Sequence, residues 1–305
     1  MDAREDTGIA SPEALAVELS RSRERLLRRI ASRRGREAEG VVLLEGPRVL
    51  EAALAHGVVP SFLVRGGRES SHDLDVLTEN LARAGAEVVE VPATAFAELA
   101  QTDSPQGILG IAAEPRATLP DPKSAGAERC LLLDGVQDPG NVGTLIRTAA
   151  ALGITRVLAL DGTADPWSAK AVRASAGLCF ALPVLAFPWE EADAWRESAG
   201  LPLLVAERGG EDIRSWLASR AGPRISGLSA SGSMGRGEGG LGWALLLGNE
   251  GQGPRAAARA RAAAQIAIPL AASVDSLNVS IAGAILLWAL GPGRESAPSS
   301  GGKGA

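Results

Sequence analysis

The sequence predicts an α/β protein with two domains, and three observations support this. Short β-like runs alternate with helical runs along most of the chain. A segment rich in proline and charge separates two such series. The 305 residues allow two domains of roughly 100–200 residues each, and 46% hydrophobic residues suffice for two sizeable cores.

Composition limits the classes of function. The formal net charge of -5 argues against a protein that coats nucleic acid through bulk electrostatics, although a local basic patch can still bind RNA. Such a patch lies between Arg21 and Arg36, where eight arginines accompany Glu24 as the single acidic residue. A solvated arginine-rich helix face has the same composition, so the residues alone leave both interpretations open.

Cysteine spacing and hydropathy indicate no disulfide, metal or membrane chemistry. Cys130 and Cys179 stand far apart without a close-spaced partner, so neither a disulfide framework nor a zinc site is indicated, and we expect no metal. No apolar segment follows the basic region near the N-terminus. We therefore expect no secretory signal, no membrane span and a cytoplasmic location.

The first series of elements begins with one or two helices, because Ser11 and Pro12 match an N-cap and a first helical residue and an apolar stripe reaches Ile30. We assign residues 1–38 to a basic helical extension. Residues 39–115 then alternate as in a compact α/β domain with a parallel or mixed sheet. Strands are expected at 41–44, 62–64, 88–91 and 108–113, and helices at 47–56, 74–84 and 93–100.

The second series occupies residues 130–290, after a linker at 116–129 that has little periodicity. Residues from about 209 to 242 interrupt it, and their Gly/Ser-rich later part predicts a flexible insertion. The tail at 291–305 is a similar candidate for disorder. Strands are expected at 130–133, 157–160, 182–186, 203–206 and 244–247, and helices at 141–152, 168–174, 189–198 and 281–290.

The first motif is LDGVQDPGNVGTLIRTAAALG, from Leu133 to Gly153. A strand ends, a turn-rich segment follows, and a helix begins at about Asn141; the apolar stripe of this helix leaves Arg147 on the polar face. Such an asparagine is ordinarily a cap and such an arginine is ordinarily solvated. An arginine is nevertheless well suited to bind a phosphate through two parallel hydrogen bonds.

The second motif is LLLGNEGQGP, from Leu245 to Pro254, in which a glycine-rich loop follows a buried-looking strand. Its glycines let the backbone approach a ligand closely, which suits a nucleotide-like cofactor, and Pro254 is placed as the first residue of a helix. No lysine follows, and the spacing is G-x-x-G-x-G. Neither a P-loop nor a Rossmann fingerprint fits.

The third motif begins IPLAASVDSLNVS at Ile268 and ends in an apolar helix at Leu290. The second half has no polar side chain on any face, so we expect protein to enclose it; polar residues interrupt the longer window too often for a membrane span. Ser276 is placed as the N-cap of this helix. Capping and turn chemistry are the ordinary explanation for Ser276 and Asn278.

These three blocks resemble, in order, spacing and wording, the three motifs of the SpoU (TrmH) RNA 2′-O-ribose methyltransferases of the SPOUT superfamily. Two further segments resemble the same family: ADPWSAKAVRASAG at 164–177 and LLEGPRVLEAALAHG at 43–57. The resemblance covers about residues 40–290. The N-terminal helices, the Gly/Ser-rich insertion and the tail depart from it.

The resemblance implies an α/β fold with an N-terminal substrate-binding domain and a C-terminal SPOUT domain, whose parallel sheet contains a deep trefoil knot. It implies S-adenosylmethionine as cofactor and a homodimer with the active site near the subunit interface. RNA is the expected partner, with no DNA and no membrane. The substrate domain favours ribosomal RNA, and the Arg21 to Arg36 segment is expected to dock it through salt-sensitive phosphate contacts.

Site residues follow from the resemblance position by position. Arg147 is expected to engage the phosphate of the target nucleotide and to help activate the ribose hydroxyl, although an arginine, with a pKa above about 12, is a poor proton acceptor. The active-site polar residues of the family match Asn141, Arg147, Glu250, Ser276 and Asn278. The expected cofactor contacts are Gly248, Ile268 and Leu277, with Leu247, Asn249 and Gly253 beside them.

Three alternatives stay open beside ribosomal RNA 2′-O-methylation. Transfer RNA is a second possible acceptor. A protein that binds RNA but has lost catalysis is another, and the intact polar set argues against it. Methylation of a base nitrogen is the third, and the SLNVS wording argues against it. Methyl transfer to a ribose oxygen requires alignment and help with deprotonation, so the absence of histidine from all three motifs is no obstacle.

Overall fold

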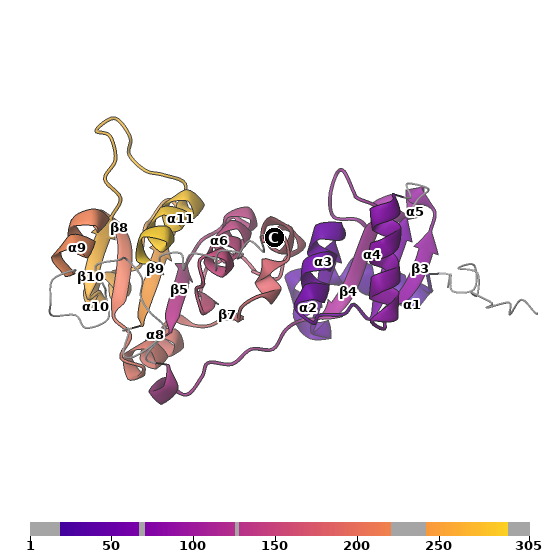
Figure 1. The fold of residues 1–305 in the computed structure, drawn as a ribbon, viewed down its shortest axis with the longest axis horizontal. Helices are drawn as coiled ribbons and strands as arrows, with labels where there is room; N and C mark the ends of the chain where they lie inside the picture. Colours follow the sequence, from indigo (N-terminus) through magenta and orange to yellow (C-terminus); the bar gives the residue numbers. More distant parts are fainter. Residues whose placement is uncertain (1–18, 67–70, 126–127, 221–241, 292–305) are drawn as a thin grey trace, which may run out of the picture. The chain divides into compact units, whose positions relative to one another are not determined.

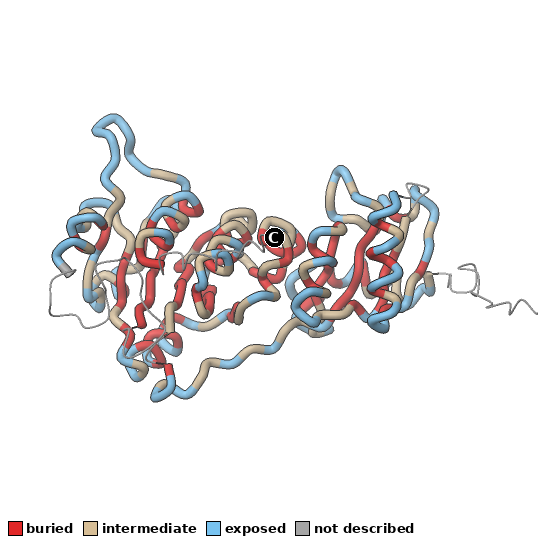
Figure 2. The backbone as a smooth tube through the Cα atoms, viewed as in Figure 1, coloured by how far each residue is buried: buried red, intermediate tan, exposed pale blue. Residues whose placement is uncertain are grey.

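The computed structural model describes residues 19–66, 71–125, 128–220 and 242–291. The chain divides into two compact units, residues 1–114 and 115–305. Each unit has its own sheet with a buried core (Figures 1 and 2). In the described part of the chain, no helix has the length and hydropathy needed to cross a membrane.

The first unit contains a four-stranded mixed sheet with the order β1-β4-β2-β3. Strand β4 runs antiparallel to β1 and β2, and β2 runs parallel to β3. The neighbours Phe62 and Leu63 are both buried and point to opposite faces, so helices have to cover both sides. The strands are β1 (Val41–Glu45), β2 (Phe62–Gly66), β3 (Glu87–Val91) and β4 (Ile108–Ala113), and the helices are α1 (Arg21–Ile30), α2 (Arg33–Glu39), α3 (Pro47–Ala55), α4 (His72–Arg83) and α5 (Ala93–Leu99).

Helices α1 and α2 belong to the first unit. Leu27 and Ile30 are buried in its core, and the guanidinium of Arg23 lies 5.0 Å from the ring centroid of Phe62. Arg23 also donates a hydrogen bond of 2.9 Å to Glu87 of β3. The amphipathic helices therefore join the core that follows them, whereas residues 1–38 were expected to form a separate extension. The N-cap expected at residue 11 lies outside the described residues.

The second unit contains a six-stranded sheet, entirely parallel, with the order β10-β8-β9-β5-β6-β7. Its central strands are continuous apolar runs because helices cover both faces (Figure 1). This confirms the predicted α/β domain with a parallel sheet. The strands are β5 (Arg129–Asp134), β6 (Arg156–Ala159), β7 (Val184–Ala186), β8 (Leu203–Asp212), β9 (Trp243–Gly248) and β10 (Ala264–Ala267).

The helices of this unit pack on both faces of the sheet. Trp189 and Trp195 of α8 lie in a core with Leu132 and Leu246, on the face that α10 also covers through Ala258. Helices α6 and α11 pack together on the other face. The helices are α6 (Pro139–Ala151), α7 (Ala169–Ala174), α8 (Trp189–Ser198), α9 (Ile213–Arg220), α10 (Ala256–Arg261) and α11 (Val279–Leu290), with short 3-10 turns η2 (Pro122–Ser124) and η3 (Leu178–Phe180).

Strand order places two of the motifs side by side. The chain runs from β5 outward through β6 to β7, crosses to β8, and then inserts β9 between β8 and β5. Asp134 at the end of β5 is the register partner of Gly248 at the end of β9. In open parallel sheets, ligands bind beyond the carboxyl ends of the strands where the strand order reverses. The site is therefore expected at this edge.

Several local predictions differ from the structure. Residues 209–220, expected as the start of the insertion, instead continue β8 and form α9. Its remainder, 221–241, and most of the expected disordered tail, 292–305, lie outside the described residues. The expected linker packs on the second unit: Leu119 lies against the core, and Trp195 Nε1 donates to the Pro120 carbonyl at 2.9 Å. Its apolar residues explain this docking.

Three expected helix starts are also wrong. Helix α6 begins at Pro139 instead of Asn141, because Asp138 is the cap and accepts a hydrogen bond from the Asn141 N–H at 3.3 Å. Helix α10 begins at Ala256, two residues after Pro254. Helix α11 is capped by Asn278 and not by Ser276; Asn278 Oδ1 accepts from the backbone N–H groups of residues 280 and 281.

In the part of the chain that the structure describes, helix α11 is buried on one face and exposed on the other. Gly283 packs so closely on α6 and β9 that an added Cβ would lie 2.3 Å from Leu145 and 2.7 Å from Leu247. The opposite side exposes Ile281, Ile285 and Trp288, which are 51%, 39% and 76% exposed. Within the described residues, the expected enclosure by protein is therefore met on one face of the helix, and the other face is open.

Candidate functional site

The glycine-rich loop after β9 is shaped by one asparagine. Asn249 Nδ2 donates to the carbonyl of Gly135 at 2.8 Å, and Asn249 Oδ1 accepts from the N–H groups of Gly251 and Gln252, each at 2.9 Å. Gly248 can have no side chain here, because a Cβ would lie 2.2 Å from the Pro254 nitrogen. The glycine at 248 thus lets the loop fold back on itself.

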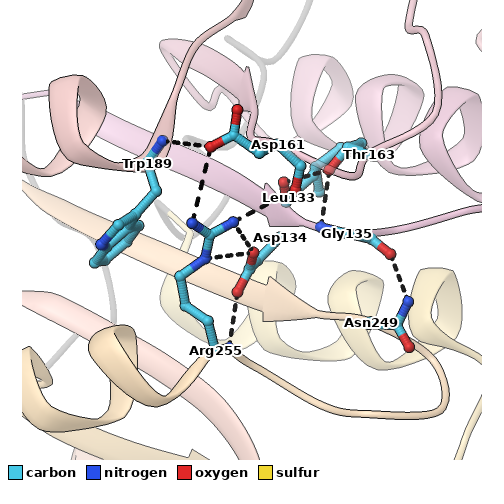
Figure 3. A network of polar contacts seen from close by, with 8 residues as sticks. All are labelled: Leu133, Asp134, Gly135, Asp161, Thr163, Trp189, Asn249 and Arg255. Atoms are coloured by element: carbon cyan, nitrogen blue, oxygen red, sulfur yellow. Dashed lines mark hydrogen bonds and ion pairs between the residues drawn. The ribbon is translucent and has the colours of Figure 1, made fainter.

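A buried ion pair fixes the far end of the same loop (Figure 3). Asp134, 5% exposed, accepts hydrogen bonds from Arg255 N at 2.9 Å and Arg255 Nε at 2.8 Å. The Arg255 guanidinium also lies 5.3 Å from the Trp189 ring centroid and 3.9 Å from Asp161 Oδ2, which accepts from the Trp189 N–H. A carboxylate removed from water needs such partners, so Arg255 joins the start of α10 to the end of β5.

The turn after β5 is held in the same network. The Gly135 N–H donates to Thr163 Oγ1 at 2.9 Å, and this hydroxyl donates to the Leu133 carbonyl at 2.6 Å. Gly135 has φ +75°, in the left-handed region that favours glycine. Sequence reasoning named neither Asp134 nor Arg255 as functional. The signal available was a charged residue directly after the apolar run of β5.

Three predicted polar residues, one from each motif, are joined by hydrogen bonds. Asn141 Nδ2 donates to Glu250 Oε1 at 3.1 Å, and Asn278 Nδ2 donates to Asn141 Oδ1 at 3.1 Å. Glu250 Oε2 also accepts from the Gln137 N–H at 3.3 Å. Because Asp138 caps α6, the amide of Asn141 is available for these bonds. We call Glu250, Asn141 and Asn278 the polar chain.

Arg147 and Ser276 are not members of this chain. Arg147 is exposed on α6, where a ligand can reach it from solvent. Ser276 is exposed on the loop before α11 and lines a cavity instead. Asn278 makes two kinds of contact, since its Oδ1 caps α11 while its Nδ2 bonds to Asn141. The structure thus brings together three of the five predicted polar residues.

A cavity of about 450 Å³, here called the β8–β10 cavity, is lined by residues of β8, β10 and α11 and by the loop before α11. Its lining includes Ile268, Ser276 and Leu277, and residues 206–209 in the middle of β8, where the pairing of this strand with β9 ends. The predicted contacts from the second motif, namely Leu247, Gly248, Asn249 and Gly253, are not among its lining residues. The volume is typical of small-ligand sites, and the apolar wall suits an adenine ring.

Three titratable groups with shifted pKa values help to define the chemistry. A hydrogen bond from Lys170, 2.5 Å away, holds the pKa of Asp138 below its usual range. Burial raises the pKa of the Cys179 thiol to about 12, and it raises that of Cys130 as well. Since the thiolate is the nucleophile, these cysteines are not suited to covalent catalysis. Among the described residues, no group of His, Cys, Asp and Glu could hold a metal ion.

Comparisons with known proteins give matches in both units. The model of the SpoU rRNA Methylase family matches residues 128–288, and that of the MRM3-like substrate binding domain matches residues 23–110. The chain is 31% identical over 265 residues to the 23S rRNA (guanosine(2553)-2'-O)-methyltransferase RlmP of Bacillus subtilis (strain 168), covering 86% of this chain and 93% of that protein. It is 31% identical over 232 residues to the 23S rRNA (guanosine-2'-O-)-methyltransferase RlmB of Xylella fastidiosa (strain 9a5c). This match covers 74% of this chain and 85% of that protein.

Solved structures show the same two-unit organisation. The AdoMet-bound rRNA methyltransferase of Sinorhizobium meliloti has a TM-score of 0.72 at 27% identity, covering 90% of this chain and 97% of that one. The SpoU methyltransferase AviRb of Streptomyces viridochromogenes, in complex with AdoMet, also has a TM-score of 0.72, at 25% identity. This match covers 89% of this chain and 97% of that one. The match extends over both units.

Proposed function

The chain belongs to the SpoU rRNA methylase family, and from that premise we propose that it transfers the methyl group of S-adenosylmethionine to a ribose 2′-hydroxyl of ribosomal RNA. The observation that supports this best is the polar chain, in which one residue from each motif meets at the edge where strand order reverses. The relatives named above are 23S rRNA 2′-O-methyltransferases, which favours ribosomal over transfer RNA. A cytoplasmic location accords with that substrate.

The cofactor is proposed to occupy the β8–β10 cavity. Ile268 and Leu277 would contact its adenine, and the second-motif loop, with Leu247, Gly248, Asn249 and Gly253, would lie at its methionine end. S-adenosylmethionine supplies a methyl group on a cationic sulfur that is already a good leaving group. The protein therefore has to align the acceptor oxygen and assist the loss of its proton.

The polar residues have separate roles in this alignment and proton removal. Arg147, exposed on α6, binds the phosphate of the target nucleotide through its planar guanidinium. Glu250 orients the amide of Asn141, and Asn278 fixes its other end. Ser276, on the cavity wall, lies between cofactor and acceptor. Because an arginine is a poor base, phosphate assistance or a relay completes proton removal.

A homodimer is part of the same proposal. One side of α11 exposes Ile281, Ile285 and Trp288, which are spaced four and three residues apart. The preceding loop also exposes Leu270 and Val274. An apolar patch of this kind on a monomer marks an interaction site, and a second copy is the occupant that the family resemblance implies. The deep trefoil knot stays a prediction alongside it.

One experiment tests the proposed activity. The full chain is incubated with labelled S-adenosylmethionine and either ribosomal or transfer RNA, and ribose methylation is then mapped. Label on a ribose of ribosomal RNA is expected. Label in transfer RNA alone would move the activity to the other acceptor. Label on a base, or intact cofactor binding with no transfer to any RNA, would refute ribose methylation.

A further inference from the structure

Glu207 is a charged residue on the wall of the β8–β10 cavity, and it belongs to none of the three motifs. It follows Ala206, which pairs with Leu247 of β9, so Glu207 lies level with Gly248 at the carboxyl edge of the sheet. Its side chain is 20% exposed, and its Oε1 accepts a hydrogen bond of 2.6 Å from Arg259 Nε. Arg259 thus holds the carboxylate at the cavity wall.

The other charged residues on this wall are paired with each other. Arg208 and Asp275 lie 3.2 Å apart with side chains that are 78% and 88% exposed. In the described part of the chain, the Glu207 side chain makes a single hydrogen bond, which Arg259 donates. A carboxylate accepts hydrogen bonds through both oxygens, so Oε2 can serve a donor in the cavity. Glu207 is thus the shielded charge that a cavity ligand would meet.

We propose that Glu207 binds the ribose of S-adenosylmethionine by accepting hydrogen bonds from its 2′- and 3′-hydroxyls. The inference rests on the proposed placement of the cofactor in this cavity. The reacting methyl has to lie near the polar chain, beyond β5 and β9, while the apolar wall at Ile268 and Leu277 suits the adenine. The ribose joins these two parts, so it lies beside Glu207, close to the end of β9 and to the point where β8 stops pairing with β9.

The chemistry of the ligand favours this partner. A vicinal diol offers two hydroxyl donors on one side of the sugar, and a carboxylate offers two acceptor oxygens to match. Dinucleotide-binding folds hold a ribose through an acidic residue in the same way. The bonds to Glu207 are charge-assisted and partly shielded from water, which strengthens them relative to neutral pairs.

Calorimetric titration of the full chain tests the assignment, with S-adenosylmethionine and S-adenosylhomocysteine as probes. We expect Glu207→Ala to weaken both to a similar extent, by about tenfold or more. Adenosine and 2′-deoxyadenosine are then compared as competitors. The natural chain should prefer adenosine, and the variant should lose that preference. Unchanged affinity, retained preference, or a loss confined to the sulfonium form would overturn the proposal.

Control variants distinguish the role of Glu207 from the placement of the cofactor in the β8–β10 cavity, on which that role rests. Glu211→Ala removes an exposed carboxylate from the same strand, outside the cavity, and should bind both probes as the natural chain does. Ala282→Phe and Ala272→Trp fill the cavity from α11 and from the loop, and thermal melts check their folding. If both fold and still bind the cofactor, the placement fails. If they lose binding while Glu207→Ala does not, only the role of Glu207 fails.

Discussion

At the scale of single residues, the site depends on asparagines that bond in two directions. Asn249 joins its own loop to Gly135, and Asn278 caps α11 while it bonds to Asn141. In each case the carbonyl oxygen of the side chain accepts from one segment, and its NH₂ group donates to another. An aspartate would keep the acceptor and lose the donor. Both positions therefore require the asparagine amide itself, because an aspartate of the same shape cannot donate the second hydrogen bond.

Arg147→Ala is expected to abolish methyl transfer while cofactor affinity stays unchanged. The side chain is exposed on α6 and is not among the residues that line the cavity, so its loss removes a phosphate contact without disturbing the fold. Single-turnover methylation and calorimetry measure the two effects separately. Arg214→Ala, an exposed arginine of α9, is the control and should stay active. An active Arg147→Ala enzyme would remove this residue from the mechanism.

Asp134→Ala is expected to destabilise the second unit by about 3 kcal/mol, because it leaves the partly buried Arg255 with only the more distant and more exposed carboxylate of Asp161. Urea unfolding monitored by circular dichroism measures the change. Arg255→Met and the double variant complete a double-mutant cycle. A coupling energy near zero would show that the two side chains act independently.

At the scale of elements, the start of α6 depends on Asp138, whose pKa is lowered by the bond from Lys170. Its stabilising contribution is therefore present above the unfolded-state pKa, and it is lost as pH falls through the lower folded-state value. Asp138→Ala should cost about 1 kcal/mol at neutral pH. Asp138→Asn keeps a good cap and should remove only this part of the pH dependence. Urea unfolding from neutral to acid pH checks both variants.

Helix α11 carries the predicted dimer contact. Trp288→Glu places a charge on an exposed apolar patch and should weaken self-association by at least about 2 kcal/mol, while the monomer stays folded. Analytical ultracentrifugation measures the shift from dimer to monomer. Val76→Glu alters an exposed apolar residue of the other unit and serves as the control. If both variants sediment like the natural chain, this face is not the interface.

At the scale of the whole molecule, the basic helices pack within the first unit, so truncation is a poor test of RNA docking. Deleting residues 1–38 would remove Leu27 and Ile30 from the core and weaken the unit for that reason alone. Several of its arginines are paired with glutamates, among them Arg23, Arg28 and Arg29. Arg25 and Arg34 are exposed, and no carboxylate of the described residues pairs with them.

Replacing Arg25 and Arg34 together by serine is therefore the sharper test. We expect weaker RNA binding and a salt dependence whose log–log slope falls by roughly 1.5, since two phosphate contacts are lost. Filter binding at several salt concentrations measures this, and calorimetry should show unchanged cofactor affinity. An unaltered RNA affinity would exclude these two arginines from docking.

The amino-acid sequence was sufficient to predict the alternation of strands and helices, the parallel sheet of the second unit and the three motifs. Hydrophobic runs such as Leu131 to Leu133 and Leu245 to Leu247 are local signals of buried parallel strands. Short or weakly apolar elements escaped detection: β10 has four residues, and α9 follows directly on β8. The caps of α6 and α11 were misplaced by three and two residues, because several neighbouring polar residues can serve as a cap.

The pairs of side chains that meet in the site follow from the way the chain folds in three dimensions. Asn141 bonds to Glu250 and Asn278, 109 and 137 positions away, and Arg255 bonds to Asp134 across 121 positions. These contacts depend on the insertion of β9 beside β5, which local periodicity does not encode. Local periodicity also does not determine which side of α11 is buried, because its residues are apolar on every face. Packing against α6 and β9 alone selects the buried side and leaves Trp288 exposed.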